Sequence, residues 1–296
     1  MNSIKNLIAS LSGERSVLIA GPTASGKSRL AMEIAAHFGA PVVNADALQV
    51  YADWRILTAR PSTEDEAFVD HRLYGHIPGT QVYSVGDWLR ELTPLLAGPP
   101  PVIVGGTGLY FSALTEGLAD IPSTPDEIRA QGDALLAEHG LNALLVAIDS
   151  ETRARIDVSN KRRVQRAWEV LQTTGKGLAA WQDETGAPLL PLSDAQALVL
   201  SAPKPWLTPR IAQRFDMMMK AGLLDEARTN ADAFHTALPS AKAIGAAEVI
   251  AHMKGESDFA AAKEAVVIQT RQYAKRQRSW FRARMSAWRW IDAADL

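Results

Sequence analysis

The residues from Gly21 to Ser28, Gly-Pro-Thr-Ala-Ser-Gly-Lys-Ser, have the spacing of a phosphate-binding loop, G-x-x-x-x-G-K-[ST]. An apolar run at Ser16–Ala20 precedes them and indicates a buried strand, and Arg29–Phe38 follows with helical periodicity. A glycine turn that opens a helix directs backbone N–H groups and the positive end of the helix dipole toward an anion, and Lys27 adds a full charge. The pattern therefore predicts a diphosphate or triphosphate site rather than a chance glycine turn.

Two further side chains could act on that anion. Ser28 can place its hydroxyl on Mg²⁺. Asp46 ends a second apolar run, Pro41–Asp46, and ligands of open α/β sheets lie beyond the carboxyl ends of the strands. A carboxylate there could be a general base or an outer-shell ligand of Mg²⁺, but it could equally be an aspartate that only caps a turn.

A second glycine turn, Gly105–Gly108, follows the apolar run Pro101–Val104. Glycines let a ligand approach the backbone, and Thr107 supplies a hydroxyl and an N–H group. On its own this short turn is weak evidence for a site.

Two basic clusters stand out in a chain whose formal net charge is −2. They comprise Lys161, Arg162, Arg163 and Arg166, and then Arg271, Lys275, Arg276, Arg278, Arg282 and Arg284. At helical spacing Arg271, Lys275, Arg278 and Arg282 share one face, with Tyr273, Trp280 and Phe281 interleaved. Such arrays bind phosphate backbones, and aromatic rings stack on bases. The alternative is a solvated helix face whose aromatic residues pack in the core, and the composition favours neither.

The elements that must position these residues follow an α/β pattern. Strand-like and helix-like segments alternate over the first 120 residues, and a fourth strand is expected at Ala197–Ser201, which predicts a parallel sheet flanked by helices. Helices are also expected at 125–139, 160–173, 208–221, 223–234, 241–253 and 258–287. The expected organisation is a core domain of residues 1–121 and 197–296, with a mostly helical insertion domain at 122–196.

Composition excludes several classes of protein. Of 296 residues, 47% are hydrophobic and 22% charged, as in globular proteins with a sizeable core. There is no cysteine, and His71, His76 and His235 lack metal-ligand spacing. Neither a signal peptide nor a run of 18 apolar residues is found, so we expect a cytoplasmic protein without a membrane partner.

Taken together, the motifs resemble one family, the tRNA dimethylallyltransferases, also called tRNA isopentenyltransferases. The matching segments are Gly21–Ser28 (G-P-T-A-S-G-K-[ST]), Asp46–Tyr51 (D-S-x-Q-V-Y), Thr58–Pro61 (T-A-K-P), Val104–Phe111 (V-G-G-T-G-L-Y), Asn160–Glu169 (N-x-R-R-x-x-R-A-L-E), Leu238–Gly245 (L-P-[AS]-x-[RQ]-A-I-G) and Gln269–Gln277 (Q-x-T-R-x-[YL]-A-K-R-Q). Each could arise by chance, but all of them in the family's order could not.

The resemblance implies a P-loop core like that of small kinases and a helical insertion that grips the anticodon stem-loop of tRNA. It implies transfer of a dimethylallyl group from dimethylallyl diphosphate to the N6 amine of the adenosine 3′ of the anticodon, with Mg²⁺ as cofactor. In that reaction Lys27 stabilises the leaving diphosphate, Asp46 takes the N6 proton, and Thr107 contacts the diphosphate or the flipped base.

Binding residues follow from the same resemblance. The diphosphate would lie on Gly21, Thr23, Ala24, Ser25, Gly26, Lys27 and Ser28, with Mg²⁺ at Ser28. The tRNA would contact Asp46, Ala47, Leu48, Gln49, Thr107, Arg129, Arg162, Arg163, Val164, Gln165, Arg166, Lys242, Arg271 and Lys275.

The chain departs from the family pattern at several positions. Ala47 replaces the usual Ser, Leu57 replaces Gly, Arg60 replaces Lys, Lys242 replaces Arg or Gln, and Ala246 replaces Tyr. These changes affect fine substrate contacts rather than the class of reaction. The chain ends soon after the second basic cluster, without the zinc-finger extension of eukaryotic members, so we expect a bacterial-type enzyme. We also expect a monomer, because tRNA binding between the core and the insertion needs no partner.

Two other functions fit part of the pattern. A small-molecule P-loop kinase would use the same loop and Asp46 with ATP, but it gives the basic clusters no role. A non-catalytic RNA-binding protein would keep the clusters but has no need for Lys27, Ser28 and Asp46.

Overall fold

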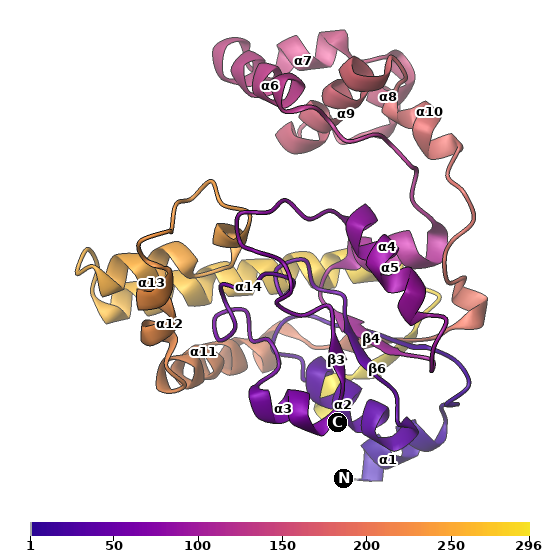
Figure 1. Cartoon of the computed structure of the whole chain (residues 1–296), viewed down its shortest axis with the longest axis vertical. Helices are drawn as coiled ribbons and strands as arrows, with labels where there is room; N and C mark the ends of the chain where they lie inside the picture. The colour runs from indigo at the N-terminus through magenta and orange to yellow at the C-terminus, as the bar shows by residue number, and fades with distance from the viewer. Residues whose placement is uncertain (1) are drawn as a thin grey trace. The chain divides into compact units, whose positions relative to one another are not determined.

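The computed structural model describes residues 2–296, and the larger of its two compact units contains a sheet of six parallel strands (Figure 1). The strands are β1 (Val17–Ala20), β2 (Val42–Asn44), β3 (His71–Arg72), β4 (Val102–Gly105), β5 (Gln196–Ser201) and β6 (Arg289–Asp292). Their order across the sheet is β3-β2-β4-β1-β5-β6, so β1 lies between β4 and β5. The predicted α/β fold with a parallel sheet is confirmed, and β1 delivers the glycine loop to the centre of the sheet's carboxyl edge.

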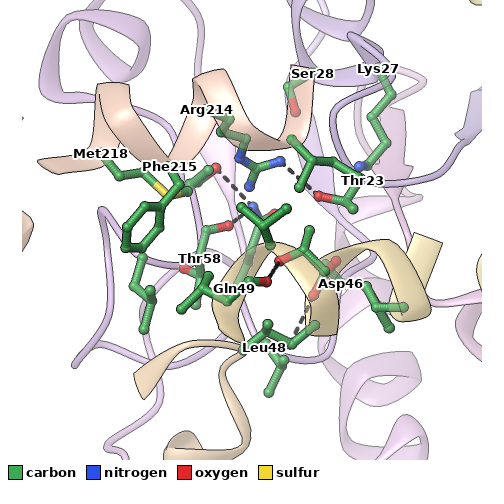
Figure 2. A pocket seen from close by; sticks show the side chains of 18 residues that line it. Thr23, Lys27, Ser28, Asp46, Leu48, Gln49, Thr58, Arg214, Phe215 and Met218 are labelled. Atoms are coloured by element: carbon green, nitrogen blue, oxygen red, sulfur yellow. Dashed lines mark hydrogen bonds between the residues drawn. The ribbon is translucent and has the colours of Figure 1, made fainter. Parts of the chain in front are cut away.

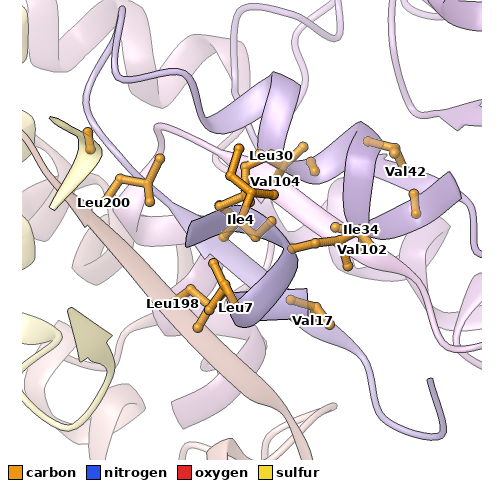
Figure 3. Packing of buried hydrophobic residues seen from close by; sticks show 14 of the residues in the cluster. Ile4, Leu7, Val17, Leu30, Ile34, Val42, Val102, Val104, Leu198 and Leu200 are labelled. Atoms are coloured by element: carbon orange, nitrogen blue, oxygen red, sulfur yellow. The ribbon is translucent and has the colours of Figure 1, made fainter. Parts of the chain in front are cut away.

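The central strands β1 and β4 are continuous apolar runs because both faces of the sheet are covered there. Val17 and Ile19 point to one face, where they pack in a core with side chains of α1 and α2 (Figure 3). Leu18 and Ala20 point to the other face, where Trp88 belongs to the second core. The sheet thereby holds β1 and its loop between two packed layers.

Nine helices accompany the sheet among the described residues. They are α1 (Asn2–Ala9), α2 (Lys27–Phe38), α3 (Thr63–Phe68), α4 (Val85–Leu95), α5 (Gly108–Glu116), α11 (Lys204–Lys220), α12 (Leu223–Asn230), α13 (Ala246–Met253) and α14 (Phe259–Arg284). Short 3₁₀ turns occupy Leu192–Asp194, Ser240–Lys242 and Ala293–Asp295. Helices α11 and α14 pack against each other (Figure 1). No helix within residues 2–296 has the length and apolar character needed to cross a membrane.

The chain divides into two compact units, residues 1–115 with 189–296, and residues 116–188. The second unit consists of helices α6 (Asp126–His139), α7 (Leu141–Ala147), α8 (Ser150–Arg155), α9 (Lys161–Thr174) and α10 (Leu178–Asp183). Its own core includes Leu144, Val164, Ala167 and Trp168. Helix α9 begins where the side chain of Asn160 accepts a hydrogen bond from the Arg163 N–H group.

Several helix boundaries differ from those expected. The helix predicted at 241–253 is a 3₁₀ turn followed by α13, because Gly245 adopts φ +95°, a left-handed conformation that interrupts a helix. Helix α11 begins at Lys204, four residues before the expected start, with Pro205 in its first turn. Strand β6 has an exposed Arg-Trp-Ile-Asp sequence that carries little strand signal.

Candidate active site

The glycine loop has the backbone shape of an anion cradle. Ala24 and Gly26 both adopt left-handed conformations, with φ of +62° and +88°. Gly21 is tightly enclosed, since a Cβ atom there would stand 2.9 Å from the Ser25 hydroxyl and 3.1 Å from the Leu200 Cβ. Helix α2 begins directly after Gly26, so its first amides have no acceptor within the helix and can bind an anion.

Other amides of the loop already have partners in the protein. The Gly21 N–H donates to the Gly105 carbonyl at 3.3 Å, and the Ser25 N–H donates to the Pro22 carbonyl at 3.2 Å. The Thr23 N–H donates to the side-chain oxygen of Gln277 at 2.9 Å. These three amides therefore shape the loop and are not free to bind an anion.

A pocket of about 130 Å³ opens beside the loop. It is lined by Thr23, Lys27, Ser28, Asp46, Leu48, Gln49, Leu57, Thr58, Ala59, Ile211, Arg214, Phe215, Met218, Ile244, Val266, Val267, Thr270 and Tyr273. Figure 2 shows Lys27 and Ser28 on one side of this pocket and Phe215 and Met218 on the other, with Arg214 between them. The pocket therefore has a charged end and an apolar end.

Lys27 is the charged group whose environment is most unusual. Burial lowers its pKa from 10.5 to about 8, since desolvation disfavours the ammonium form. The negative charge of Asp46 opposes this shift, and the positive charge of Arg214 adds to it. An arriving diphosphate would compensate these unfavourable terms, so the site is electrostatically suited to an anion.

Arg214 on α11 is a site residue that the sequence did not reveal. Its guanidinium donates to the Thr23 hydroxyl at 2.8 Å (Figure 2), and Arg210, one turn earlier, donates to the Ala24 carbonyl at 3.2 Å. The available signal was the i, i+4 spacing of these two arginines, which puts both on one helix face. Only the fold shows that this face meets the phosphate-binding loop.

Asp46 both caps a turn and lines the pocket. One carboxylate oxygen, Oδ1, accepts a hydrogen bond from the Leu48 N–H at 3.0 Å, as a turn aspartate does. The same side chain lines the pocket, and its Oδ2 lies 3.2 Å from where a Cβ on Gly106 would stand. Oδ2 is thus the atom left to act on a ligand.

Thr107 supports the turn that carries Asp46. Its hydroxyl accepts a hydrogen bond from the Ala47 N–H at 3.0 Å. Its own N–H donates to the Ala45 carbonyl at 3.3 Å, so this amide is bonded within the protein. The neighbouring Tyr273 lines the pocket, and its hydroxyl interacts with the Thr107 side chain. Burial raises the pKa of Tyr273, which stays a neutral hydroxyl.

Residues 57–59 form another wall of the pocket, and the segment from Arg55 to Ala59 is fixed from two directions. The carboxylate of Glu226 accepts hydrogen bonds from the N–H groups of Arg55, Ile56 and Leu57 at 2.6, 2.7 and 3.0 Å. The Gln49 amide donates to the carbonyls of Thr58 and Ala59, each at 2.9 Å. Gln49, expected at the tRNA interface, thus holds this wall with its amide nitrogen. Nothing in the sequence pointed to Glu226.

The basic residues of the second unit divide into two kinds. Arg129, Arg162 and Arg163 are exposed, and none of them forms an ion pair within the described chain. Arg166 is half-buried, its guanidinium donates to the Thr124 hydroxyl at 2.5 Å, and burial lowers its pKa. Arg166 therefore has a structural role in this unit.

Two further residues of α9 were expected to contact tRNA. Val164 is fully buried in the core of the second unit, so a tRNA contact by its side chain is contradicted. The Gln165 amide donates to the carboxylates of Asp133 at 2.7 Å and Glu169 at 3.0 Å. The start of α9, rather than its whole basic segment, is the free cationic surface.

The second basic cluster lines a groove of about 480 Å³ between α11 and α14. Arg271, Lys275, Arg278 and Arg282 all contribute, as their predicted common face requires, and Lys204 of α11 adds a fifth cation. The interleaved aromatic residues behave differently: Phe281 is 1% exposed in the second core, so the expectation that it could stack on a base is wrong. Lys242 is exposed in its 3₁₀ turn.

No cluster of three or more histidine and acidic side chains that could hold a metal occurs in residues 2–296. Mg²⁺ does not require one, because it usually binds through one or two protein oxygens together with water and substrate phosphates. The exposed Ser28 lines the charged end of the pocket and fits that requirement.

A phosphate-binding loop at the centre of a parallel sheet, with a lysine and an arginine facing a carboxylate across a pocket, defines a P-loop α/β protein that acts on a phosphorylated ligand. Comparisons with known proteins narrow this class. The IPP transferase family model matches residues 49–284, and the isopentenyl transferase model matches residues 15–74. The chain belongs to the tRNA dimethylallyltransferase family.

Relatives match over nearly the whole chain. A tRNA dimethylallyltransferase of Cereibacter sphaeroides is 60% identical over 93% of this chain and 88% of its own length. One of Dinoroseobacter shibae is 59% identical over 95% of this chain and 96% of its own length. The crystal structure of the tRNA isopentenylpyrophosphate transferase of Bacillus halodurans is 31% identical, with a TM-score of 0.64 over 95% of this chain and 90% of that one. A eukaryotic dimethylallyltransferase acting on tRNA, 24% identical, shares the fold with a TM-score of 0.79 over 95% of this chain and 74% of its own.

Proposed function

We propose that this chain transfers the dimethylallyl group of dimethylallyl diphosphate to the N6 amine of the adenosine 3′ of the anticodon in tRNAs that read codons beginning with U. The bond from N6 to the allylic carbon forms, the carbon–oxygen bond to the diphosphate breaks, and N6 loses a proton. The products are N6-isopentenyladenosine and diphosphate. The observation that carries the proposal is Asp46 facing Lys27 and Arg214 across one pocket.

The charged end of the pocket holds the diphosphate in this proposal. The amides that begin α2, with Lys27 and Arg214, supply the positive potential that the leaving group needs as its charge grows. Gly21, Thr23, Ala24 and Ser25 hold the loop in shape through the contacts described above. Ser28, with diphosphate oxygens, would hold Mg²⁺, which when bound neutralises charge on the leaving diphosphate.

Asp46 acts as the general base in this proposal. Its Oδ1 is engaged by the Leu48 amide, which fixes the carboxylate plane, and Oδ2 is left to accept a hydrogen bond from the adenine N6 and then its proton. Thr107 holds the Ala47 amide and so keeps the Asp46 turn in place. An exocyclic amine is a weak nucleophile, so its alignment with the allylic carbon contributes much of the rate.

Cationic surfaces bind the tRNA. Arg129, Arg162 and Arg163 of the helical unit, and Arg271 and Lys275 of α14, are exposed and contact phosphates of the anticodon stem-loop. The target adenine leaves the loop stack to reach the pocket, as other base-modifying enzymes require. A monomer provides every residue named here.

The deciding experiment measures transfer of a radiolabelled dimethylallyl group to a synthetic anticodon stem-loop with Mg²⁺, using the wild type and Asp46→Ala in parallel. We expect transfer by the wild type and almost none by the variant. If the wild type transfers nothing to a loop with the correct adenosine but transfers the γ-phosphoryl group of ATP to a small acceptor and releases ADP, the kinase function replaces this one.

A further inference from the structure

The buried side-chain amide of Gln277 on α14 joins two turns that border the pocket. Its oxygen accepts a hydrogen bond from the Thr23 N–H at 2.9 Å, and its nitrogen donates to the Gly106 carbonyl at 3.0 Å. Thr23 belongs to the phosphate-binding loop, and Gly106 belongs to the glycine turn that follows β4. We infer that Gln277 is a positioning residue, which aligns the loop that holds the diphosphate with the turn that holds Asp46. This inference rests on the proposed function.

The glycine turn is bonded to the backbone on both sides of Asp46. Thr107 accepts a hydrogen bond from the N–H of residue 47 at 3.0 Å and donates one to the carbonyl of residue 45 at 3.3 Å. A Cβ atom on Gly106 would stand 2.2 Å from the Gln277 nitrogen and 3.2 Å from Oδ2 of Asp46, so both side chains converge on the same side of this glycine. The Gln277 amide therefore lies beside the carboxylate oxygen that acts as the base.

Helix α14 can approach the glycine turn only because the turn lacks side chains there. A Cβ atom on Gly106 would collide with the Gln277 nitrogen, and one on Gly108 would stand 2.2 Å from Cε3 of Trp280. Glycine at these two positions thus admits side chains of α14, whereas the sequence suggested the approach of a ligand. The close packing leaves the Gln277 amide little freedom to move.

A neutral amide suits this position better than a charged group does. Gln277 is 5% exposed and interrupts the run of cations at positions 275–278. The bridge needs one acceptor and one donor on the same side chain, and a primary amide supplies both. A lysine or arginine would offer no acceptor to the Thr23 N–H, and a carboxylate would offer no donor to the Gly106 carbonyl.

Both turns keep other supports when this bridge is lost. The Thr23 hydroxyl still accepts a hydrogen bond from Arg214 at 2.8 Å. The bases of the two turns remain joined, because the Gly21 N–H donates to the Gly105 carbonyl at 3.3 Å. Each substrate should therefore still bind, whereas the alignment of the allylic carbon with the adenine N6 should be lost. A misplacement of about 1 Å can lower a rate by about 10²-fold.

The first test replaces Gln277 with methionine, which has a similar length but cannot form the bridge. We expect kcat for dimethylallyl transfer to the synthetic stem-loop to fall by about 10²-fold. The Kd for inorganic diphosphate with Mg²⁺ and the Kd for the stem-loop should each change by less than about threefold. Gln213→Met is the matched control, because Gln213 is an exposed residue of α11 that lines neither pocket. Its kcat should stay within about twofold of the wild type.

The second test restores the bridge by protonation in Gln277→Glu. A protonated carboxyl group can donate to the Gly106 carbonyl and accept from the Thr23 N–H, whereas the ionised group has no donor. Burial and the negative charge of Asp46 raise the pKa of a carboxyl group here, and the positive charge of Lys27 opposes this shift. We expect kcat relative to the wild type at the same pH to rise at least about tenfold between about pH 8 and about pH 5.5.

Comparison at equal pH cancels the titration of Asp46, which the wild type and the variant share. Gln213→Glu introduces the same carboxyl group at an exposed position, so its kcat relative to the wild type should vary by less than about twofold over this pH range. A merely structural role of Gln277 would lower the melting temperature without producing this dependence on pH.

The outcomes separate this inference from the proposed function. If the wild type transfers dimethylallyl and the folded Gln277→Met and Gln277→Glu variants keep its kcat at every pH, Gln277 does not align the two turns, and the proposed function stands. An equal loss of diphosphate affinity and kcat in Gln277→Met would also overturn the inference, because Gln277 would then act on binding. If the wild type transfers no dimethylallyl, the proposed function itself fails. Thermal melting identifies a variant that does not fold, and if Gln277→Met is one, the pH dependence of Gln277→Glu decides.

Discussion

The guanidinium of Arg214 donates a hydrogen bond to the hydroxyl of Thr23 over 2.8 Å, and this bond joins helix α11 to the phosphate-binding loop. Because burial lowers the pKa of Arg214 without depriving an arginine of its charge, the group remains a cation at every physiological pH. Two cationic side chains thus line the pocket, Lys27 from the loop motif and Arg214 from a distant helix.

The first prediction concerns that arginine. Arg214→Gln removes the charge but keeps a donor for Thr23, so kcat/KM for dimethylallyl diphosphate should fall by about 10²–10³ while the Kd for the stem-loop changes less than about threefold. Arg210→Gln, which loses a contact to the Ala24 carbonyl and a cation–π contact with the Trp206 ring, is the matched control and should cost under about tenfold. An equal loss in both variants would mean that Arg214 acts only through loop structure.

The second prediction concerns pH. Lys27 has a lowered pKa of about 8, so in the free enzyme it is charged below that pH and becomes neutral as the pH rises through it. Loss of the ammonium charge weakens diphosphate binding, so kcat/KM for dimethylallyl diphosphate should fall on the alkaline side of about pH 8. Lys27→Arg keeps its charge at high pH and should lack this alkaline decline, even if its overall rate is lower.

The third prediction separates the two roles of Asp46. Asp46→Asn retains an oxygen that can accept the Leu48 amide but cannot take a proton, whereas Asp46→Ala loses both functions. Both variants should lose about two to four powers of ten in kcat while binding the stem-loop nearly as the wild type does. Asp46→Ala should also be less stable, by about 1 kcal/mol, in thermal unfolding. A large loss of RNA affinity in Asp46→Asn would contradict the general-base role.

The fourth prediction tests the support of the pocket wall. Glu226→Ala removes the acceptor of three backbone N–H groups and should lower the free energy of unfolding by about 2–4 kcal/mol. Asp225→Asn on the same helix affects a side chain that is 80% exposed and should change the free energy of unfolding by less than about 0.5 kcal/mol. Denaturant unfolding of both variants provides the comparison. A Glu226→Ala variant as stable as the wild type would show that this wall does not depend on the carboxylate.

The sequence predicted the parts of the site that depend on local patterns. Lys27 and Ser28 follow from one continuous motif, and Asp46 follows from its place at the end of an apolar strand. Arg214 and Glu226 could not be found in this way, because they lie on helices more than 150 positions along the chain from the segments they bind. The packing of α11 and α12 creates these contacts. Helical periodicity in the sequence predicts the two helices, but it does not indicate which other elements they pack against.

Val164 shows the opposite error, in which a motif was extended too far. It lies between basic residues in the segment Asn160–Glu169, yet helical periodicity turns it away from Arg162 and Arg163 and into the core. Reading the helix face together with the motif would have assigned it to the interior. The same reasoning explains Phe281, which lies in a basic helix but faces the second core.

The fifth prediction uses this distinction on α9. Arg162→Ala removes an exposed cation that lacks an ion pair within residues 2–296, so tRNA affinity should fall and the slope of log K against log salt concentration should decrease by about one unit. Val164→Ala should instead lower the melting temperature through a cavity and leave that slope unchanged. Binding titrations at several salt concentrations distinguish the two effects. An unchanged slope in Arg162→Ala would remove this arginine from the phosphate contacts, and the start of α9 would then need another explanation for its three adjacent cations.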